Sequence, residues 1–350
     1  MNCAAAAPVC AGLPEVAVSD FRVPGTGPGV SLHVRNKRLL GDRARAHQPV
    51  VIFVHGATYP GTAVFDHAMF GGGSWLDDMA VHGFDAYSFD VRGYGLSSRP
   101  EELGENGRRG LPYARTYDAV ADLKAVVDFV RERTQGLQAN LIGWSWGTAI
   151  AGEFASTHCD LVRHLVMVSP LWIIRNSPVV AMSRWMTSAL PTLLHGDLLG
   201  AYRSITKAEA RQRWVRGLDP DVAEQLIPSA EFEIWWQALS NIQGGDGTMG
   251  ESVKAPNGVM ADLMDIWSAG GATYNPENIV APTLLLLGEW DVDTPAYMAF
   301  EIFSRLKSAS YKRLEVLARG THSMALEVNR VDLYRRTREF LQTQFICAEA

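Results

Sequence analysis

Near the middle of the 350-residue chain, residues 141–147 read LIGWSWG, an apolar run that ends in the pattern Gly-x-Ser-x-Gly around Ser145. A strand that turns directly into a helix forces its turn residue into strained backbone geometry, and flanking glycines leave room for the chain to double back. The hydroxyl of that residue stands clear of the backbone, and the following helix directs its N-terminal amides toward the same place. This pattern also occurs by chance, so the surrounding sequence has to decide its meaning.

Two further apolar runs lie downstream, and a polar residue with catalytic chemistry follows each. Residues 282–288 read PTLLLLG and predict a buried strand, and the loop after them contains Asp291. Residues 311–317 predict the next strand, and the loop beyond it carries His322 within Gly-Thr-His-Ser. The three residues therefore follow one another along the chain in the order Ser, Asp, His.

With these motifs the chain resembles the α/β-hydrolase superfamily, whose catalytic residues occur in that order, each on a loop after a strand of the sheet. The resemblance extends from about residue 50 to residue 345. It is strengthened by the run VVIFV at residues 50–54, which ends in His-Gly-Ala-Thr like the His-Gly loop of the family. Residues 90–97, DVRGYGLS, also match the family turn Asp-x-Arg-Gly-x-Gly-x-Ser, which we interpret as structural.

The resemblance implies a role for each catalytic residue. Ser145 would be the nucleophile, His322 the general base and Asp291 the carboxylate that orients the histidine. Asp293 lies two residues further on and is the alternative carboxylate, but the spacing Gly-x-x-Asp-x-x-x-Pro favours Asp291. The alternative for Ser145 and for His322 is that each is only a residue of its turn or loop.

The same resemblance implies an oxyanion hole made of two backbone amides. One belongs to Trp146, which follows the nucleophile, and the other to Ala57 in the His-Gly loop, with Thr58 as the alternative. His55 is expected to be structural, because this loop works through its amides. Trp144 and Thr58 are expected to contact the substrate, although packing in the core explains Trp144 nearly as well.

Apolar runs and helical patterns alternate along most of the chain. Strands are predicted near residues 50–54, 84–90, 139–143, 164–169, 283–288 and 311–317. This alternation predicts an α/β fold, the α/β-hydrolase fold, with a mostly parallel central sheet that is flanked by helices on both faces. Val30, Leu32 and Val34 alternate with polar residues, which predicts an antiparallel strand at the edge of that sheet.

Two helices have clear local signals. Val120, Leu123, Val126, Val127 and Val130 recur at helical spacing, and Asp122, Lys124, Asp128 and Arg131 are left for solvent. Ser74-Trp-Leu-Asp predicts a capping box at the start of another helix. Glycines 71–73 before it are not expected to bind phosphate, because no Gly-Lys-Ser/Thr follows.

The alternation stops between about residues 170 and 276, where no strand is evident. We expect residues 171–276 to form a helical cap inserted between the two parts of the core, residues 1–170 and 277–350. Six of the ten tryptophans lie in this segment, and together they favour an apolar ligand. Trp172 and Trp235 are the candidates for contact with the substrate, and packing of the cap against the core is the alternative for each.

Composition limits the classes of partner. A net charge of −6 with interspersed signs argues against binding to nucleic acid and does not imply anionic partners. No apolar run approaches the roughly 18 residues that a membrane span needs. The four scattered cysteines lack Cys-x-x-Cys spacing, so no metal site is expected. The N-terminus lacks the pattern of a secretory signal, which favours a cytoplasmic protein, with a trimmed secreted form as the alternative. A monomer or a homodimer is expected.

These features predict a serine hydrolase that needs no cofactor and cleaves a carboxylic ester or lactone of a fairly apolar small molecule. Serine stands where the similar epoxide hydrolases and haloalkane dehalogenases carry aspartate, which disfavours an alkyl-enzyme. Cleavage of a carbon-carbon bond in a diketone-type substrate and acyl transfer use the same triad and remain alternatives. Residues 55–61, HGATYPG, depart from the Gly-Pro-Gly loop of ring-cleavage-product hydrolases, which weakens the first of these. A non-catalytic ligand-binding module is the alternative from another class.

Overall fold

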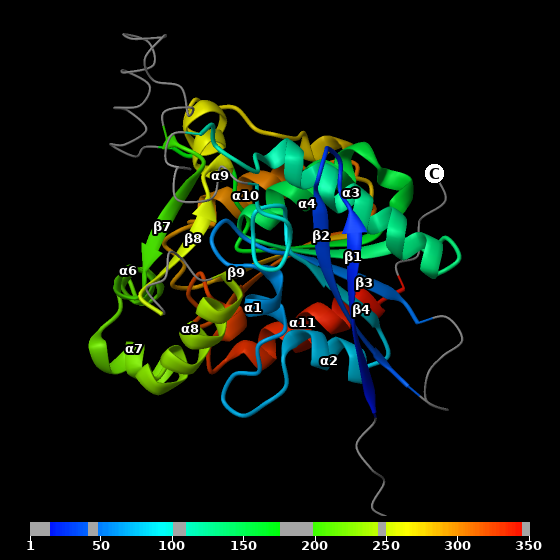
Figure 1. Ribbon diagram of the computed structural model, residues 1–350. Coiled ribbons are helices and arrows are strands. Elements are labelled where there is room, and N and C mark those ends of the chain that lie inside the picture. The colour runs from blue at the N-terminus through cyan, green and yellow to red at the C-terminus, as the bar shows by residue number, and fades with distance from the viewer. Residues whose placement is uncertain (1–14, 41–47, 101–109, 176–198, 244–249, 345–350) are drawn as a thin grey trace, which may run out of the picture.

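The central feature of the molecule is an eight-stranded sheet in the order β1-β2-β4-β3-β5-β6-β9-β10 (Figure 1). The computed structural model describes residues 15–40, 48–100, 110–175, 199–243 and 250–344. The strands are β1 (Val16–Pro24), β2 (Ser31–Leu39), β3 (Val50–Val54), β4 (Asp85–Phe89), β5 (Ala139–Trp144), β6 (Val162–Val168), β9 (Thr283–Gly288) and β10 (Lys312–Leu317). The six strands from β4 to β10 pair in parallel, whereas β1 and β2 are antiparallel. The predicted α/β-hydrolase architecture is confirmed.

The continuous apolar runs follow from a sheet that is covered on both faces. All five residues of β3 are buried. Val50, Ile52 and Val54 belong to one hydrophobic cluster, whereas Val51 and Phe53 belong to another. Because successive side chains of a strand point to opposite faces, each face of the sheet has its own core.

Helices supply the second layer on each face. The first cluster includes residues of α3, α4 and α10, and the second includes residues of α2 and α11. The helices are α1 (Gly61–Phe65), α2 (Trp75–Val81), α3 (Thr116–Arg133), α4 (Trp146–Thr157), α6 (Lys207–Trp214), α7 (Pro220–Leu226), α8 (Ser229–Gln243), α9 (Gly258–Asp262), α10 (Ala296–Arg305) and α11 (Arg330–Gln342). The capping box predicted at Ser74 begins α2, where its hydroxyl accepts a hydrogen bond from the Asp77 amide.

Two expectations for the core were wrong in detail. The strand predicted from residues 30–34 is present as β2, but β1 lies outside it as the true edge. β1 is exposed or half-exposed everywhere except Val23, and its apolar residues do not alternate regularly with polar ones, so no strand pattern marks it. Asp122 was expected in solvent but is fully buried, because Arg92 reaches it from the turn after β4 and donates hydrogen bonds to its carboxylate from Nη2 at 2.6 Å and from the backbone at 3.0 Å.

Between β6 and β9 the chain leaves the sheet and forms α6, α7 and α8, which lie together at one side of the molecule (Figure 1). The expectation that no strand occurs here was wrong. β7 (Tyr202–Thr206) and β8 (Ser252–Pro256) pair antiparallel in a separate two-stranded sheet. β7 alternates buried and exposed residues over only five positions, too short a pattern to be recognised. Residues 176–198 and the glycine-rich loop at 244–247 lie outside the described residues.

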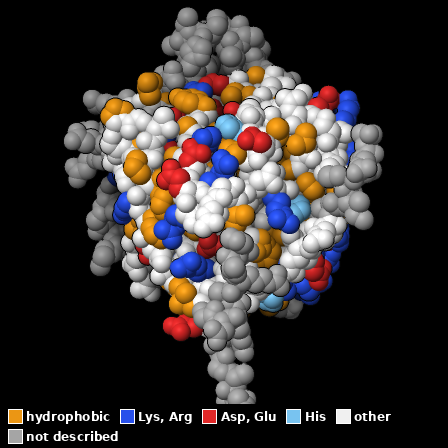
Figure 2. Space-filling view, turned by 90° about the vertical axis from the view of Figure 1, so that its right-hand side faces the viewer, with side chains coloured by type: hydrophobic (Ala, Val, Ile, Leu, Met, Phe, Trp, Pro, Cys, Tyr) orange, Lys and Arg blue, Asp and Glu red, His pale blue; other side chains and the backbone are white. Residues whose placement is uncertain are grey.

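The face turned away from α6 and α7 carries acidic and basic side chains intermixed, with no field of one sign (Figure 2). Within the part of the chain that the structure describes, no helix combines the length and the apolar character needed to cross a bilayer.

The turn from β5 into α4 is compressed by direct backbone contacts. Ser145 has φ 57° and ψ −122°, a conformation that residues with a side chain rarely adopt. A Cβ atom at Gly143 would lie 2.4 Å from the carbonyl oxygen of Gly147, and one at Gly147 would lie 2.1 Å from that of Val54. The two glycines therefore let β5, α4 and the end of β3 approach closely enough to hold Ser145 in this strained geometry.

Gly143→Ala should destabilise the protein by more than about 3 kcal/mol, because the added methyl group meets backbone atoms that cannot move independently. Gly83→Ala is the matched control. Gly83 has φ +88° but no atom within 4 Å of the added carbon, so only the backbone strain of about 1–2 kcal/mol remains. Urea and thermal unfolding measure the stability of both variants. Equal losses of stability would show that the turn from β5 into α4, the elbow that carries Ser145, is not sterically constrained.

Candidate active site

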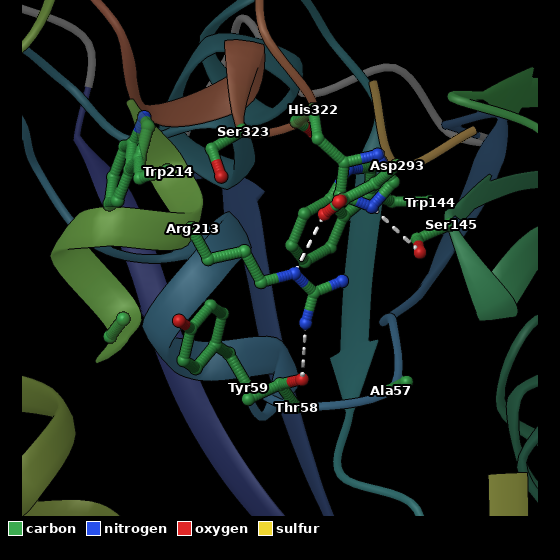
Figure 3. A pocket seen from close by; sticks show the side chains of 11 residues that line it. Ala57, Thr58, Tyr59, Trp144, Ser145, Arg213, Trp214, Asp293, His322 and Ser323 are labelled. Atoms are coloured by element: carbon green, nitrogen blue, oxygen red, sulfur yellow. Dashed lines mark hydrogen bonds and ion pairs between the residues drawn. The ribbon is translucent and has the colours of Figure 1, made fainter. Parts of the chain in front are cut away.

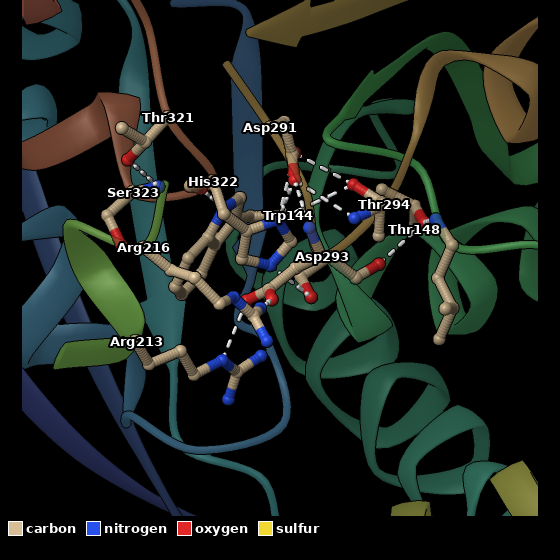
Figure 4. A network of polar contacts seen from close by, with 12 residues as sticks. Trp144, Thr148, Arg213, Arg216, Asp291, Asp293, Thr294, Thr321, His322 and Ser323 are labelled. Atoms are coloured by element: carbon tan, nitrogen blue, oxygen red, sulfur yellow. Dashed lines mark hydrogen bonds and ion pairs between the residues drawn. The ribbon is translucent and has the colours of Figure 1, made fainter. Parts of the chain in front are cut away.

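Three side chains from separate strand ends meet in one hydrogen-bonded chain, of which Figure 3 shows Ser145 with His322 and Figure 4 shows His322 with Asp291. Ser145 follows β5, Asp291 follows β9 and His322 follows β10. The Nε2 atom of His322 lies 2.9 Å from the Ser145 Oγ, and its Nδ1 lies 2.9 and 3.1 Å from the two Asp291 oxygens. Because a carboxylate only accepts hydrogen bonds, Nδ1 carries the proton that is donated to Asp291, and Nε2 is left to accept the serine proton.

Asp291 is buried and is fixed by several donors. The amides of Asp293 and Thr294 each donate to its Oδ1 at 2.9 Å, and the Thr294 hydroxyl donates to its Oδ2 at 2.8 Å. Burial by itself raises the pKa of Asp291, but the His322 imidazole and these hydrogen bonds hold that pKa below its ordinary value. Asp291 therefore stays ionised and keeps His322 in the tautomer described above.

The loop after β3 lies directly against the serine. A Cβ atom at Gly56 would lie 3.1 Å from the Ser145 Cβ. His55 is fully buried, its Nδ1 donates to the Gly56 carbonyl at 2.7 Å and its Nε2 accepts from the Val91 amide at 3.0 Å. Burial lowers the pKa of His55, which keeps the ring neutral and suits both hydrogen bonds.

The two residues predicted to form the oxyanion hole both lie beside Ser145. Trp146 is the first residue of α4, and Ala57 lines the same pocket as the serine. The Ala57 carbonyl accepts a hydrogen bond from the Tyr94 hydroxyl at 2.8 Å, which fixes the peptide chain of the loop. The indole of Trp146 points away into the core and donates to Thr116 at 2.9 Å.

A pocket opens over the serine and the histidine, and α6 forms its opposite wall (Figure 3). Thr58 and Trp144, which are expected to contact the substrate, line this pocket. Trp144 also donates from Nε1 to the His322 carbonyl at 2.8 Å, so it both shapes the pocket and holds the histidine loop. The lining residues are Ala57, Thr58, Tyr59, Trp144, Ser145, Ala210, Arg213, Trp214, Asp293, His322 and Ser323.

Trp172 and Trp235 are not in that lining; the structure places them in the packed interior. Trp172 is 2% exposed and its ring meets that of Tyr274 edge-on. Trp235 is fully buried between Tyr59 and Trp214, and its Nε1 donates to the Ala63 carbonyl at 2.9 Å. Helical periodicity marks such residues as apolar, but it does not tell which apolar face meets a ligand.

Asp293, the alternative carboxylate, is turned toward α6 rather than toward the histidine. Arg213 donates from Nε to its Oδ2 at 2.7 Å, and Arg216 also pairs with it (Figure 4). The structure thus brings Asp291, and not Asp293, to His322. These arginines were missed at the sequence level because their partner lies about eighty residues away along the chain.

A buried carboxyl group, Glu327, follows the histidine loop and was not predicted from the sequence. Its side chain is 0% exposed and accepts hydrogen bonds from the Thr321 amide at 3.1 Å and from the Trp214 indole at 3.0 Å. The Thr321 hydroxyl also contacts it. Glu327 therefore links α6, which forms the pocket wall, to the residue that precedes His322. No motif marks it, since a lone glutamate before a helix usually faces solvent.

The chain is similar in sequence or in fold to several known hydrolases. A family model described as the alpha/beta hydrolase fold matches residues 49–197. Epoxide hydrolase 3 of Xenopus tropicalis is 22% identical over 293 residues, which cover 78% of this chain and 69% of that protein. A 2-hydroxy-6-oxo-6-phenylhexa-2,4-dienoate hydrolase from a Rhodococcus strain superimposes with a TM-score of 0.59 at 15% identity, covering 94% of this chain and 100% of that one. A thermophilic esterase from Thermogutta terrifontis superimposes with a TM-score of 0.57 at 16% identity, covering 93% and 98%.

Glu327 should make the stability of the protein depend on pH. Burial raises the pKa of Glu327 to about 7, outweighing the hydrogen bonds that it accepts, whereas the unfolded value is 4.5. The folded state therefore binds more protons between these values, so stability falls as pH rises from about 4.5 to 7, by at most about 1.4 kcal/mol per pH unit.

Urea unfolding at pH 5, 6, 7 and 8 tests this expectation with Glu327→Gln. The difference in unfolding free energy between wild type and variant should decrease from pH 5 to pH 7 and level off toward pH 8, because glutamine does not titrate and Glu327 is ionised in both states above its folded pKa. Glu233→Gln, at an exposed position on α8, serves as the control and should give a far smaller slope. A difference for Glu327→Gln that stays constant with pH would contradict the raised pKa.

Proposed function

We propose that this chain, which has the α/β-hydrolase fold, is a serine hydrolase that cleaves a carboxylic ester or lactone through an acyl-enzyme on Ser145. The observation that carries this proposal is the unbroken hydrogen-bonded chain from the Ser145 hydroxyl through His322 to the buried Asp291. A core serine with no chemical role has no need of a strained turn, an imidazole and an ionised carboxylate in line.

The geometry supports a two-stage reaction. His322 accepts the serine proton at Nε2 while the Ser145 oxygen attacks the substrate carbonyl, and the amides of Ala57 and Trp146 stabilise the oxyanion. The imidazolium then protonates the leaving alkoxide as the carbon-oxygen bond breaks, which leaves the acyl group on Ser145. Water, deprotonated by the same imidazole, attacks that acyl group and releases a carboxylic acid and the free serine.

The serine at position 145 also bears on which reaction this site suits. Epoxide hydrolase 3 is named for the opening of epoxides. Epoxide hydrolases similar to this chain carry aspartate at the nucleophile position, whereas this chain carries Ser145 there. A serine ester of an acyl group is readily hydrolysed, whereas a serine ether formed from an epoxide is not. Acyl chemistry therefore suits this site. Tyr59, Trp144 and Trp214 offer apolar contacts to the rest of the substrate.

Ser145→Ala should abolish hydrolysis of simple esters, by up to about a millionfold as in the protease subtilisin, without unfolding the protein. The measurements are ester turnover and covalent labelling by a fluorophosphonate probe. Ser156→Ala, on α4 but away from the pocket, should keep full labelling. Turnover that survives in Ser145→Ala would disprove the nucleophile, and failure of the folded wild type to be labelled would favour the ligand-binding alternative.

Asp291→Asn should lower kcat by about ten-thousandfold, because an amide cannot hold the histidine in the required tautomer. Asp293→Asn should cost far less, since Asp293 contacts arginines and not His322. Steady-state kinetics on ethyl butyrate with both variants compares the two carboxylates directly. Equal losses would reject the assignment of Asp291.

A further inference from the structure

Three guanidinium groups gather beside the triad, and we refer to Arg203, Arg213 and Arg216 as the arginine cluster. Arg203 lies on β7, Arg213 on α6 and Arg216 just after α6. All three line a groove that shares Thr58, Tyr59, Ala210 and Arg213 with the pocket over Ser145. Arg203 and Arg213 each come within 3.4 Å of the Thr58 hydroxyl, so two positive charges converge on one side chain.

The cluster has too little negative charge to balance it. Asp293 is shared by Arg213 and Arg216. Among the described residues, Arg203 forms no ion pair and instead donates to the carbonyls of Ala57 at 2.6 Å and Pro256 at 2.5 Å. Glu209 also lines the groove, where its carboxylate accepts hydrogen bonds from the amide and the hydroxyl of Thr206 at 2.8 Å, so two carboxylates face three guanidinium groups.

A partly buried cation that lacks a carboxylate is costly unless an anion joins it. Burial lowers the pKa of Arg203, and the positive charge of Arg213 lowers it further, because the two guanidinium groups repel each other. The arginine cluster therefore leaves an excess of positive charge in the groove beside the pocket. A ligand with a negative group would relieve this repulsion.

Arg213 is the member of the cluster that is placed to touch such a ligand. Its guanidinium lies between Asp293 and Thr58 and extends into the pocket that Ser145 and His322 line (Figure 3). Its Nε donates to Asp293 and its Nη1 to Thr58, while its Nη2 has no hydrogen-bond partner among the described residues. A planar guanidinium with free N–H groups recognises a carboxylate by paired hydrogen bonds.

Resting on the proposed function, we infer that the substrate is an ester or lactone that carries a free carboxylate, which Arg213 binds while Arg203 adds its positive charge from behind. The pocket is small and both Ser145 and Arg213 line it, so the carboxylate stands only a few bonds from the scissile carbonyl. Half-esters of short dicarboxylic acids have this chemistry. The apolar ligand expected from the tryptophans is thereby replaced by one with an apolar body and an anionic end.

The test compares matched esters that differ in one charge. Monoethyl succinate is compared with ethyl butyrate, and monoethyl glutarate with ethyl pentanoate, by the ethanol released. For at least one pair, wild type should show a kcat/KM that is about tenfold or more in favour of the anionic ester, the size expected of a charge-assisted hydrogen bond. Arg213→Gln should reduce that ratio to about one or below, and Arg213→Lys, which keeps the charge but not the planar fork, should retain part of it.

Arg211→Gln is the matched control, because Arg211 lies on the same helix but contacts Glu224 and the Ile227 carbonyl and does not line the pocket. Its ratio should equal that of wild type. Equal or better cleavage of both neutral esters by wild type, or a ratio that Arg213→Gln leaves unchanged, would overturn the carboxylate site while fluorophosphonate labelling of Ser145 still upholds the hydrolase. Absence of both labelling and cleavage of all four esters would instead overturn the proposed function itself and this inference with it.

Discussion

The close approach of backbone to backbone around Ser145 is the constraint on which the site depends. Gly143, Gly147 and Gly56 each occupy a place where a side chain would collide with the elbow or with the serine itself. The same device recurs at the other end of the triad, where a Cβ atom at Gly288 would lie 2.3 Å from the carbonyl oxygen of Gly320. Glycine contacts thus bring together the strand ends that carry Ser145, Asp291 and His322.

Buried polar groups then hold the loops that these contacts bring together. His55 fixes the loop after β3 through Gly56, and Thr294 fixes Asp291. Glu327 binds both the Trp214 indole on α6 and the residue before His322. Because one carboxyl group accepts hydrogen bonds from two elements, it ties the wall of the pocket to the loop that carries His322.

The sequence was informative where the signal is local and where burial is complete. The parallel strands were predicted because both faces of the sheet are covered, and the elbow because its glycines stand at fixed offsets from Ser145. Contacts between distant segments gave no such signal. Asp122 is buried only because Arg92 reaches it from a turn thirty residues earlier, and Asp291 and Asp293 differ only in which way each side chain turns.

The arginine cluster shows why whole-chain charge is a poor guide to a binding site. The net charge of −6 implied no anionic partner, yet exposed charges are screened over about 10 Å, so only the groups around the pocket set its local potential. There, two carboxylates, Asp293 and Glu209, face three guanidinium groups. Asp291 does not line the pocket, and His322 lies between it and Ser145. The mouth of the pocket is therefore positive in a protein that is acidic overall, and selection of an anionic substrate follows from that local excess.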